Sequence, residues 1–85
     1  MITDKLIERF EEKVYELGEA DIRLILETNN RVDLIDEFEH SINEEFEQSP
    51  IPFKKDDLWA ECFSMWVTNT DEPDLEKLIR STLEV

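Results

Sequence analysis

Apolar residues recur every three or four positions along most of this chain, and few residues interrupt that spacing. The 85 residues include one Gly and three Pro, so the backbone has few built-in turns and few positions that exclude a helix. Spacing of this period places apolar side chains on one side of a helix, whereas a half-buried strand requires alternation. The pattern therefore predicts an all-α fold, a small bundle of four to five short helices.

The clearest helical segment covers residues 3–17. Its apolar side is formed by Leu6, Ile7, Phe10, Val14 and Leu17. Either Thr3 or Asp4 can cap the start of this helix, and Gly18 suits the left-handed position that follows a last helical turn. We therefore expect a helix from about Thr3 to Leu17.

Three later segments repeat this pattern at residues 31–48, 56–67 and from Pro73 onward. Asn30 is a good N-cap for the first of them, Asp56 for the second, and Asp71 or Glu72 for the third. The first should end before Pro50, which disfavours helical geometry at the preceding residue. The second carries apolar residues around much of its circumference, as buried central helices do. These residues are Leu58, Trp59, Cys62, Phe63, Met65, Trp66 and Val67.

The segment at residues 19–28 is ambiguous. Ile22, Leu24, Ile25 and Leu26 form a short apolar run that fits a short helix, but residues 22–35 also fit a β-hairpin whose two strands flank Asn29-Asn30, a plausible two-residue turn. We favour the helix, because the rest of the chain has no strand-like segment and a lone hairpin is marginally stable in water.

Size and cysteine content favour one domain over residues 1–85 and a cytoplasmic location. The first residues are polar and of mixed charge, so no signal peptide is visible, and no apolar run reaches the length of a membrane-spanning helix. Cys62 is the only cysteine, which excludes a disulfide within the chain. We expect no cofactor and no membrane partner.

Charge narrows the class of partner further. The chain has 23 Asp and Glu against nine Lys and Arg, a formal charge of -14. Direct binding to nucleic acid or to an anionic membrane surface is disfavoured, because both require clustered Lys and Arg. A hydrophobic content of 40% is too high for a disordered acidic tail. We therefore expect a folded acidic domain.

The acids are concentrated in residues 31–48, which hold seven acidic residues and one basic residue, Arg31. At about 100° per residue, five of them share one side of the helix, opposite Ile35, Phe38, Ile42 and Phe46. These five are Asp33, Asp36, Glu37, Glu44 and Glu47. The row is roughly 21 Å long at about 1.5 Å per residue. A solvated face of a soluble protein has the same composition. The alternative is a contact surface for a cationic groove.

Enzymatic chemistry finds little support in the sequence. Cys62 lies among apolar residues, as an inert thiol does. Glu37 and His40 have the i, i+3 spacing seen in di-iron helical bundles, but His40 is the only histidine, so a full site would need a symmetric dimer. On the first helix, bases alternate with acids so that opposite charges can meet.

These features predict a non-enzymatic acidic binding protein that inhibits or neutralises a basic, nucleic-acid-handling partner such as a nuclease, a defence effector or a DNA-binding protein. DNA-mimic counter-defence proteins of phage, immunity proteins and antitoxins share this type of composition. The alternatives are a structural or adaptor bundle that binds through apolar contacts and a dimeric carboxylate-bridged di-metal protein. Trp59, Phe63 and Trp66 are expected to be core residues, with a self-association surface as the alternative, so a homodimer stays open.

Overall fold

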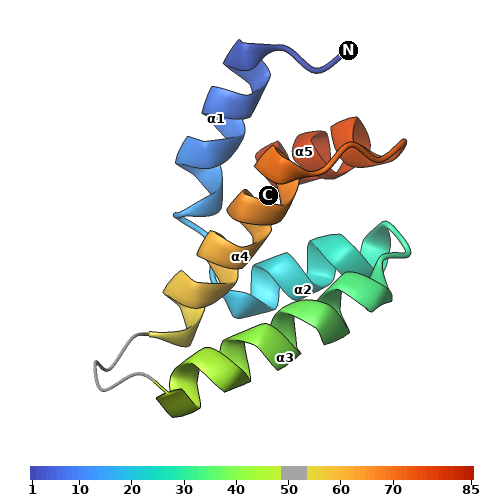
Figure 1. Cartoon of the computed structure of the whole chain (residues 1–85). Helices are drawn as coiled ribbons and strands as arrows, with labels where there is room; N and C mark the ends of the chain where they lie inside the picture. The colour runs from blue at the N-terminus through green and yellow to red at the C-terminus, as the bar shows by residue number, and fades with distance from the viewer. Residues whose placement is uncertain (49–53) are drawn as a thin grey trace.

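The computed structural model of the chain describes residues 1–48 and 54–85, with the backbone alone described for residues 46–48. These residues form five helices and no strand, which confirms the predicted all-α bundle (Figure 1). The helices are α1 (Asp4–Val14), α2 (Glu19–Thr28), α3 (Val32–Gln48), α4 (Lys55–Asn69) and α5 (Leu75–Leu83). Among the residues described, none of the helices combines the length and the apolar character that crossing a membrane requires.

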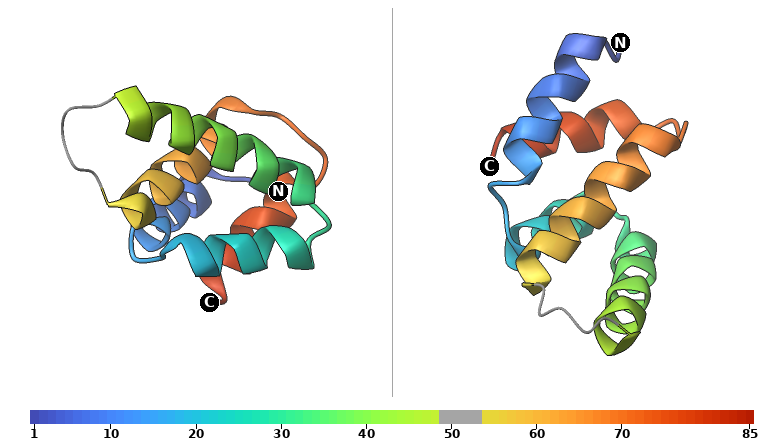
Figure 2. Two further views of the ribbon diagram at one scale, coloured as in Figure 1. Left: turned by 90° about the horizontal axis from the view of Figure 1, so that it is seen from below. Right: turned by 60° about the vertical axis from the view of Figure 1, so that its left-hand side comes forward.

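Helix α4 occupies the centre of the bundle. It contacts α1, α2 and α3, while α5 packs against α1 and α2 (Figure 2). Phe63 of α4 meets Phe10 of α1 edge to face, with ring centroids 5.3 Å apart, and Trp59 of α4 meets Phe38 of α3 at 6.3 Å. Trp59 and Phe63 are both almost fully buried. The core interpretation of these aromatic residues is therefore confirmed, and Trp66 packs partly buried against the same core.

Residues 22–35 form two helices and the turn between them, so the hairpin alternative was wrong. Ile22, Ile25 and Leu26 are buried at helical spacing, while Leu24 is 61% exposed. A strand would have placed Ile22, Leu24 and Leu26 on one side together. As a helix, this segment buries Ile22, Ile25 and Leu26 in the core of the bundle. As a strand, it would have no neighbouring strand to pair with among the described residues.

The turn at Asn29-Asn30 ends α2 by backbone hydrogen bonding. The amide of Asn30 donates to the carbonyl of Glu27 at 3.1 Å, and that of Arg31 donates to the carbonyl of Leu26 at 2.8 Å. Asn30 has φ 59°. This pairing with a left-handed residue is the Schellman motif, in which Asn is a common second choice to Gly. Asn30 therefore closes α2, and the prediction that it is the N-cap of α3 was wrong.

The start of α2 is capped from another part of the chain. Gly18 precedes Glu19 in extended geometry and has no side chain to offer, so it is not the left-handed residue that the sequence predicted after α1. Instead, the Asp56 carboxylate accepts a hydrogen bond from the amide of Glu19 at 2.9 Å. A Cβ at position 18 would lie 2.9 Å from that carboxyl group. The absence of a Cβ at Gly18 thus leaves room for the Asp56 carboxylate, which caps α2 rather than α4.

The other helix ends deviate by a few residues from the predictions. Thr3 caps α1 as expected, with its Oγ1 accepting from the amide of Leu6 at 3.2 Å, but α1 ends at Val14. After Val14, the amides of Glu16 and Leu17 donate to carbonyls three residues earlier, and Leu17 remains buried. Helix α5 begins only at Leu75, and α4 extends beyond residues 56–67 at both ends. Helix α3 ends at Gln48 as predicted, and the Pro50 signal lies outside the described residues.

We predict that Asp56→Ala lowers the free energy of unfolding by about 1 kcal/mol, the usual value of an N-cap side chain. Asp57→Ala is the matched control, because Asp57 occupies the same first turn of α4 without a side-chain hydrogen bond among the described residues. Urea denaturation followed by circular dichroism measures both. Equal losses in the two variants would show that the Asp56 cap contributes nothing beyond the charge of that turn.

Candidate functional site

Helix α3 is amphipathic in the structure as well as in the sequence. Leu34, Ile35, Phe38 and Ile42 are at most 5% exposed, and the helix packs through this side on α2 and α4. Phe46, predicted to continue that side, has no described side chain. Because about two turns of α3, from Leu34 to Ile42, are fixed by packing, the backbone that carries the opposite side is held rigidly. The position of each acidic side chain then follows from helical geometry.

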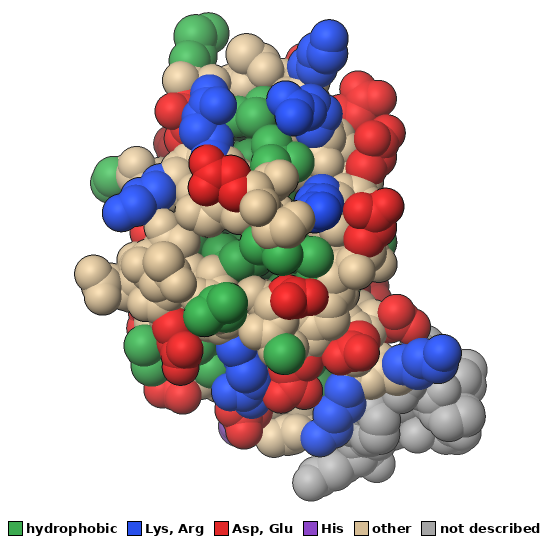
Figure 3. All heavy atoms as spheres, turned by 180° about the vertical axis from the view of Figure 1, so that it is seen from behind, with side chains coloured by type: hydrophobic (Ala, Val, Ile, Leu, Met, Phe, Trp, Pro, Cys, Tyr) green, Lys and Arg blue, Asp and Glu red, His purple; other side chains and the backbone are tan. Residues whose placement is uncertain are grey.

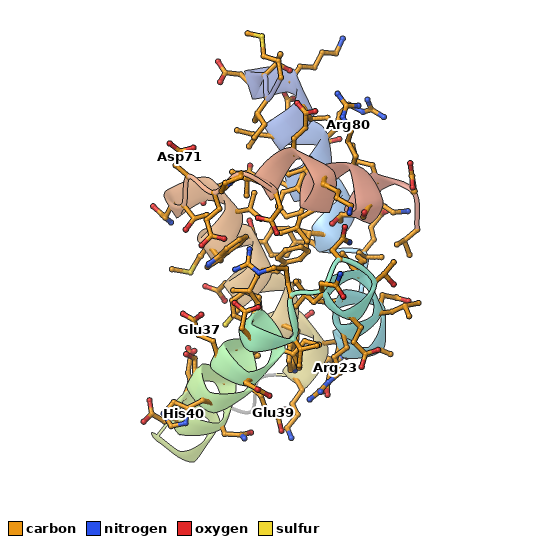
Figure 4. The ribbon with its side chains drawn as sticks, turned by 90° about the vertical axis from the view of Figure 1, so that its right-hand side faces the viewer. Arg23, Glu37, Glu39, His40, Asp71 and Arg80 are labelled. Atoms are coloured by element: carbon orange, nitrogen blue, oxygen red, sulfur yellow. The ribbon has the colours of Figure 1, made fainter. Side chains whose placement is uncertain are left out.

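Four of the five predicted acidic residues lie exposed along the outer side of α3. We call Asp33, Asp36, Glu37 and Glu44 the acidic face. The fifth predicted member, Glu47, has a side chain outside the described residues. Figure 4 shows Glu37 and His40 projecting from α3 away from the bundle, whereas Glu39 lies toward α2 and Arg23. The predicted grouping is therefore present for the described members, and His40 lies among them.

Asp33 differs from the rest of the acidic face because it is neutralised. The Arg31 guanidinium donates to both of its carboxylate oxygens at 3.1 Å, and this contact lowers the pKa of Asp33 below its usual value. Arg31 also binds Glu72 and Asp74 ahead of α5 and lies 5.3 Å from the centre of the Trp66 ring. Arg31 therefore joins the start of α3 to the segment between α4 and α5.

The remaining members of the acidic face have no basic partner from Lys or Arg in the described part of the chain. Asp36 and Glu37 form no ion pair there, and Glu44 has only His40, whose Nε2 lies 3.4 Å from Glu44 Oε1. Both side chains of that contact are largely exposed. Asp36 and Glu37 stand three and four positions from Asp33, and like charges at this spacing repel, although Arg31 offsets part of that repulsion. The outer surface of α3 is a row of solvated carboxylates with free acceptor oxygens.

Sequence reasoning missed the role of Arg23. Its guanidinium donates to Glu19 at 2.8 Å and to Glu39 at 2.9 Å and covers the Trp59 ring at 4.8 Å. Together these contacts raise the pKa of Arg23, with the hydrogen bond to Glu39 the largest cause. The i, i+4 spacing of Glu19 and Arg23 was visible in the sequence, but the approach of Glu39 depends on how α2 and α3 pack. Arg23 therefore neutralises Glu39, the acidic residue of α3 that lies on the side toward α2.

Other candidate chemistry is limited in the described residues. No group of three His, Cys, Asp and Glu side chains there is arranged to hold a metal ion, and His40 pairs with Glu44 rather than with Glu37. The Cys62 thiol is partly buried, and burial, followed by the nearby Glu45 and Glu61, raises its pKa. A raised pKa keeps the thiol protonated, which is the less nucleophilic form.

Comparison with models of known protein families, with curated proteins and with solved structures found no match.

Arg31→Gln should lower the free energy of unfolding by about 1–3 kcal/mol at neutral pH, because it leaves three carboxylates close together without their cation. The pKa of Asp33 is lower in the folded chain than in the unfolded chain, where it is about 3.9. The Arg31–Asp33 pair therefore contributes fully to the free energy of unfolding above that pH, and the contribution is lost as pH falls through the pKa of the folded state. The deficit of the variant should therefore shrink below about pH 4. Urea denaturation at several pH values measures it.

Arg9→Gln is the control for that experiment, because Arg9 forms no ion pair in the described residues. Its effect should stay within about 0.5 kcal/mol, as for most surface substitutions. A deficit of Arg31→Gln that stayed constant down to pH 3 would contradict the assigned role of the Arg31–Asp33 pair.

A separate prediction concerns the like-charge spacing of Asp36 and Glu37 from Asp33, and of Asp36 from Glu39. Asp36→Asn combined with Glu37→Gln should raise the free energy of unfolding by a few tenths of a kcal/mol at low salt. The gain should fade as salt screens the charges. Glu39→Gln, which removes the pair with Arg23, should give no such gain. Denaturation in low and high salt distinguishes these cases, and a double variant less stable than the wild type would refute the repulsion.

Proposed function

We propose that this chain is a non-enzymatic acidic binding protein that inhibits or neutralises a basic, nucleic-acid-handling partner. The observation that carries the proposal is the row of exposed carboxylates at Asp36, Glu37 and Glu44, which have no Lys or Arg partner in the described part of the chain. They span about 12 Å along α3 at about 1.5 Å per residue. The surface offers acceptor oxygens and negative charge, which are what a Lys- and Arg-lined groove binds.

Rigidity supports this proposal. The opposite side of α3 is buried, and Arg23 and Arg31 tie the helix to α2 and to the segment before α5. A partner would therefore meet carboxylates whose backbone is already ordered, so little conformational entropy is lost on binding. A formal charge of -14 would also attract a basic partner over long range and raise the association rate.

Inhibition would follow from competition. A nucleic-acid-binding groove is lined by bases that hold phosphates. A rod bearing carboxylates that occupies this groove would exclude the nucleic acid without being a substrate. The partners that fit this description are a nuclease, a defence effector or a DNA-binding regulator. Phage counter-defence is the setting we favour, with immunity proteins and antitoxins as close alternatives.

A second candidate function has its own observation. Leu24 and Val85 are 61% and 49% exposed and line a cleft of about 170 Å³ between α2 and the end of α5. An adaptor bundle would bind its partner through such an apolar surface. Association through this cleft would be nearly insensitive to salt, whereas association through the acidic face would weaken steeply with it.

The triple variant Asp36→Asn, Glu37→Gln and Glu44→Gln tests the leading proposal. The variant should lose at least about tenfold in affinity for the partner that the wild type captures from its native cell or host. The control carries Glu8→Gln, Glu11→Gln and Glu16→Gln, which make the same change in net charge on exposed positions of another part of the chain. Mass spectrometry identifies the captured protein, and biosensor binding gives the affinities.

The outcomes distinguish an effect of the carboxylates on α3 from an effect of the net charge of the chain. Selective loss in the α3 variant, with binding that weakens from low to moderate salt, is the expected result. Equal loss in both variants would mean that net charge alone matters. Unchanged, salt-insensitive binding in both would reject the acidic face and favour the apolar cleft.

A further inference from the structure

The charged side chains that line one surface cleft between α1 and α5 are all basic. Lys5 and Arg9 come from α1 and Arg80 from α5, and the cleft has a volume of about 240 Å³. The other lining residues are Met1, Thr3 and Leu6. In a chain where acids outnumber bases 23 to nine, it is notable that no acidic residue lines this cleft, although Glu76 contacts it through Met1 and Arg80. Figure 3 shows Lys and Arg side chains on both sides of apolar surface over α1 and α5.

The two bases that α1 contributes to this cleft form no ion pair in the described residues, whereas Glu76 of α5 pairs with both the Met1 amino group and Arg80. The alternation of bases and acids on α1 predicted that opposite charges could meet, yet Lys5, Arg9 and Lys13 have no carboxylate within 4 Å in the described residues. Arg80 approaches Glu76 at 3.6 Å through its Nε and remains 57% exposed. Lys5, Arg9 and Lys13 also repel one another at i, i+4 spacing. Their side chains keep donors available for a ligand.

The shape and chemistry of the cleft favour a small phosphate. Two guanidinium groups suit a phosphate because each can present two parallel N–H donors to its oxygens. Lys5 in the first turn of α1 adds a third cation beside the positive end of that helix. Leu6 supplies an apolar wall. The volume lies below the range of about 300–1,000 Å³ for drug-sized ligands, so the ligand is small.

We propose that the α1–α5 cleft binds a small organic phosphate monoester, with the phosphate held by Arg9, Arg80 and Lys5 and the organic group against Leu6. This site lies on helices other than α3 and does not depend on the proposed inhibitor function. A wholly adventitious basic surface would bind any anion weakly and without preference, which distinguishes it from the proposed site.

Titration of the ¹⁵N-labelled full chain with phenyl phosphate tests the proposal by amide chemical shifts. At constant ionic strength and above about pH 7, where the dianion predominates, the shifts near residues 3–9 and 80 should follow one saturating curve in the millimolar range or tighter. Inorganic phosphate should bind several-fold more weakly, because it lacks the group that contacts Leu6.

The variant Arg9→Gln with Arg80→Gln should weaken phenyl phosphate binding at least about tenfold, because it removes two charge-assisted contacts. Lys77→Gln is the control, since Lys77 is exposed on α5 and does not line the cleft. A dispersed amide spectrum verifies that the double variant is folded. No saturation, equal binding of inorganic phosphate, or an unchanged affinity in the double variant would each overturn the proposal.

Discussion

Two arginine side chains determine how the acidic helix of this protein is held and which of its carboxylates stay open. Arg31 connects Asp33 to Glu72 and Asp74, and Arg23 connects Glu39 to Glu19. Each guanidinium also covers a tryptophan ring of α4. Guanidinium groups suit such positions because they combine planar stacking with several donors. A strongly acidic chain could not otherwise pack α3 closely without leaving repelling carboxylates at its seams.

The consequence is a division of the acids of α3 into two kinds. Those at the seams, Glu39 and Asp33, are paired and belong to the structure. Those on the outer side, Asp36, Glu37 and Glu44, are solvated and have no Lys or Arg partner in the described part of the chain. An acidic surface that served solubility alone would not need this order, since scattered charges serve solubility equally well and repel less. The functional proposal rests on that difference.

The features that depend on helical periodicity could be predicted from the sequence, whereas contacts between segments far apart in the chain could not. Helical spacing placed Phe38 and Ile42 inside and the acidic face outside. The hydrogen bond between Glu19 and Asp56 could not be predicted, because it joins residues 37 positions apart in a way that only the packing of α2 on α4 defines. Asn30 was misassigned because Asn suits both an N-cap and a left-handed turn, and the backbone hydrogen bonds decide between them.

Charge of opposite sign is thus gathered at two separate places in the fold. The acidic face lies on α3, which packs on α2 and α4, whereas the basic cleft lies where α1 meets α5. Neither arrangement minimises repulsion, although Glu8 and Glu12 stand at the spacing that would allow the bases of α1 to be paired. A basic partner would be attracted by one of these surfaces and repelled by the other. On the proposed function, such a partner would be drawn to α3 and not to the α1–α5 cleft, so the two proposed ligands would not compete for the same residues.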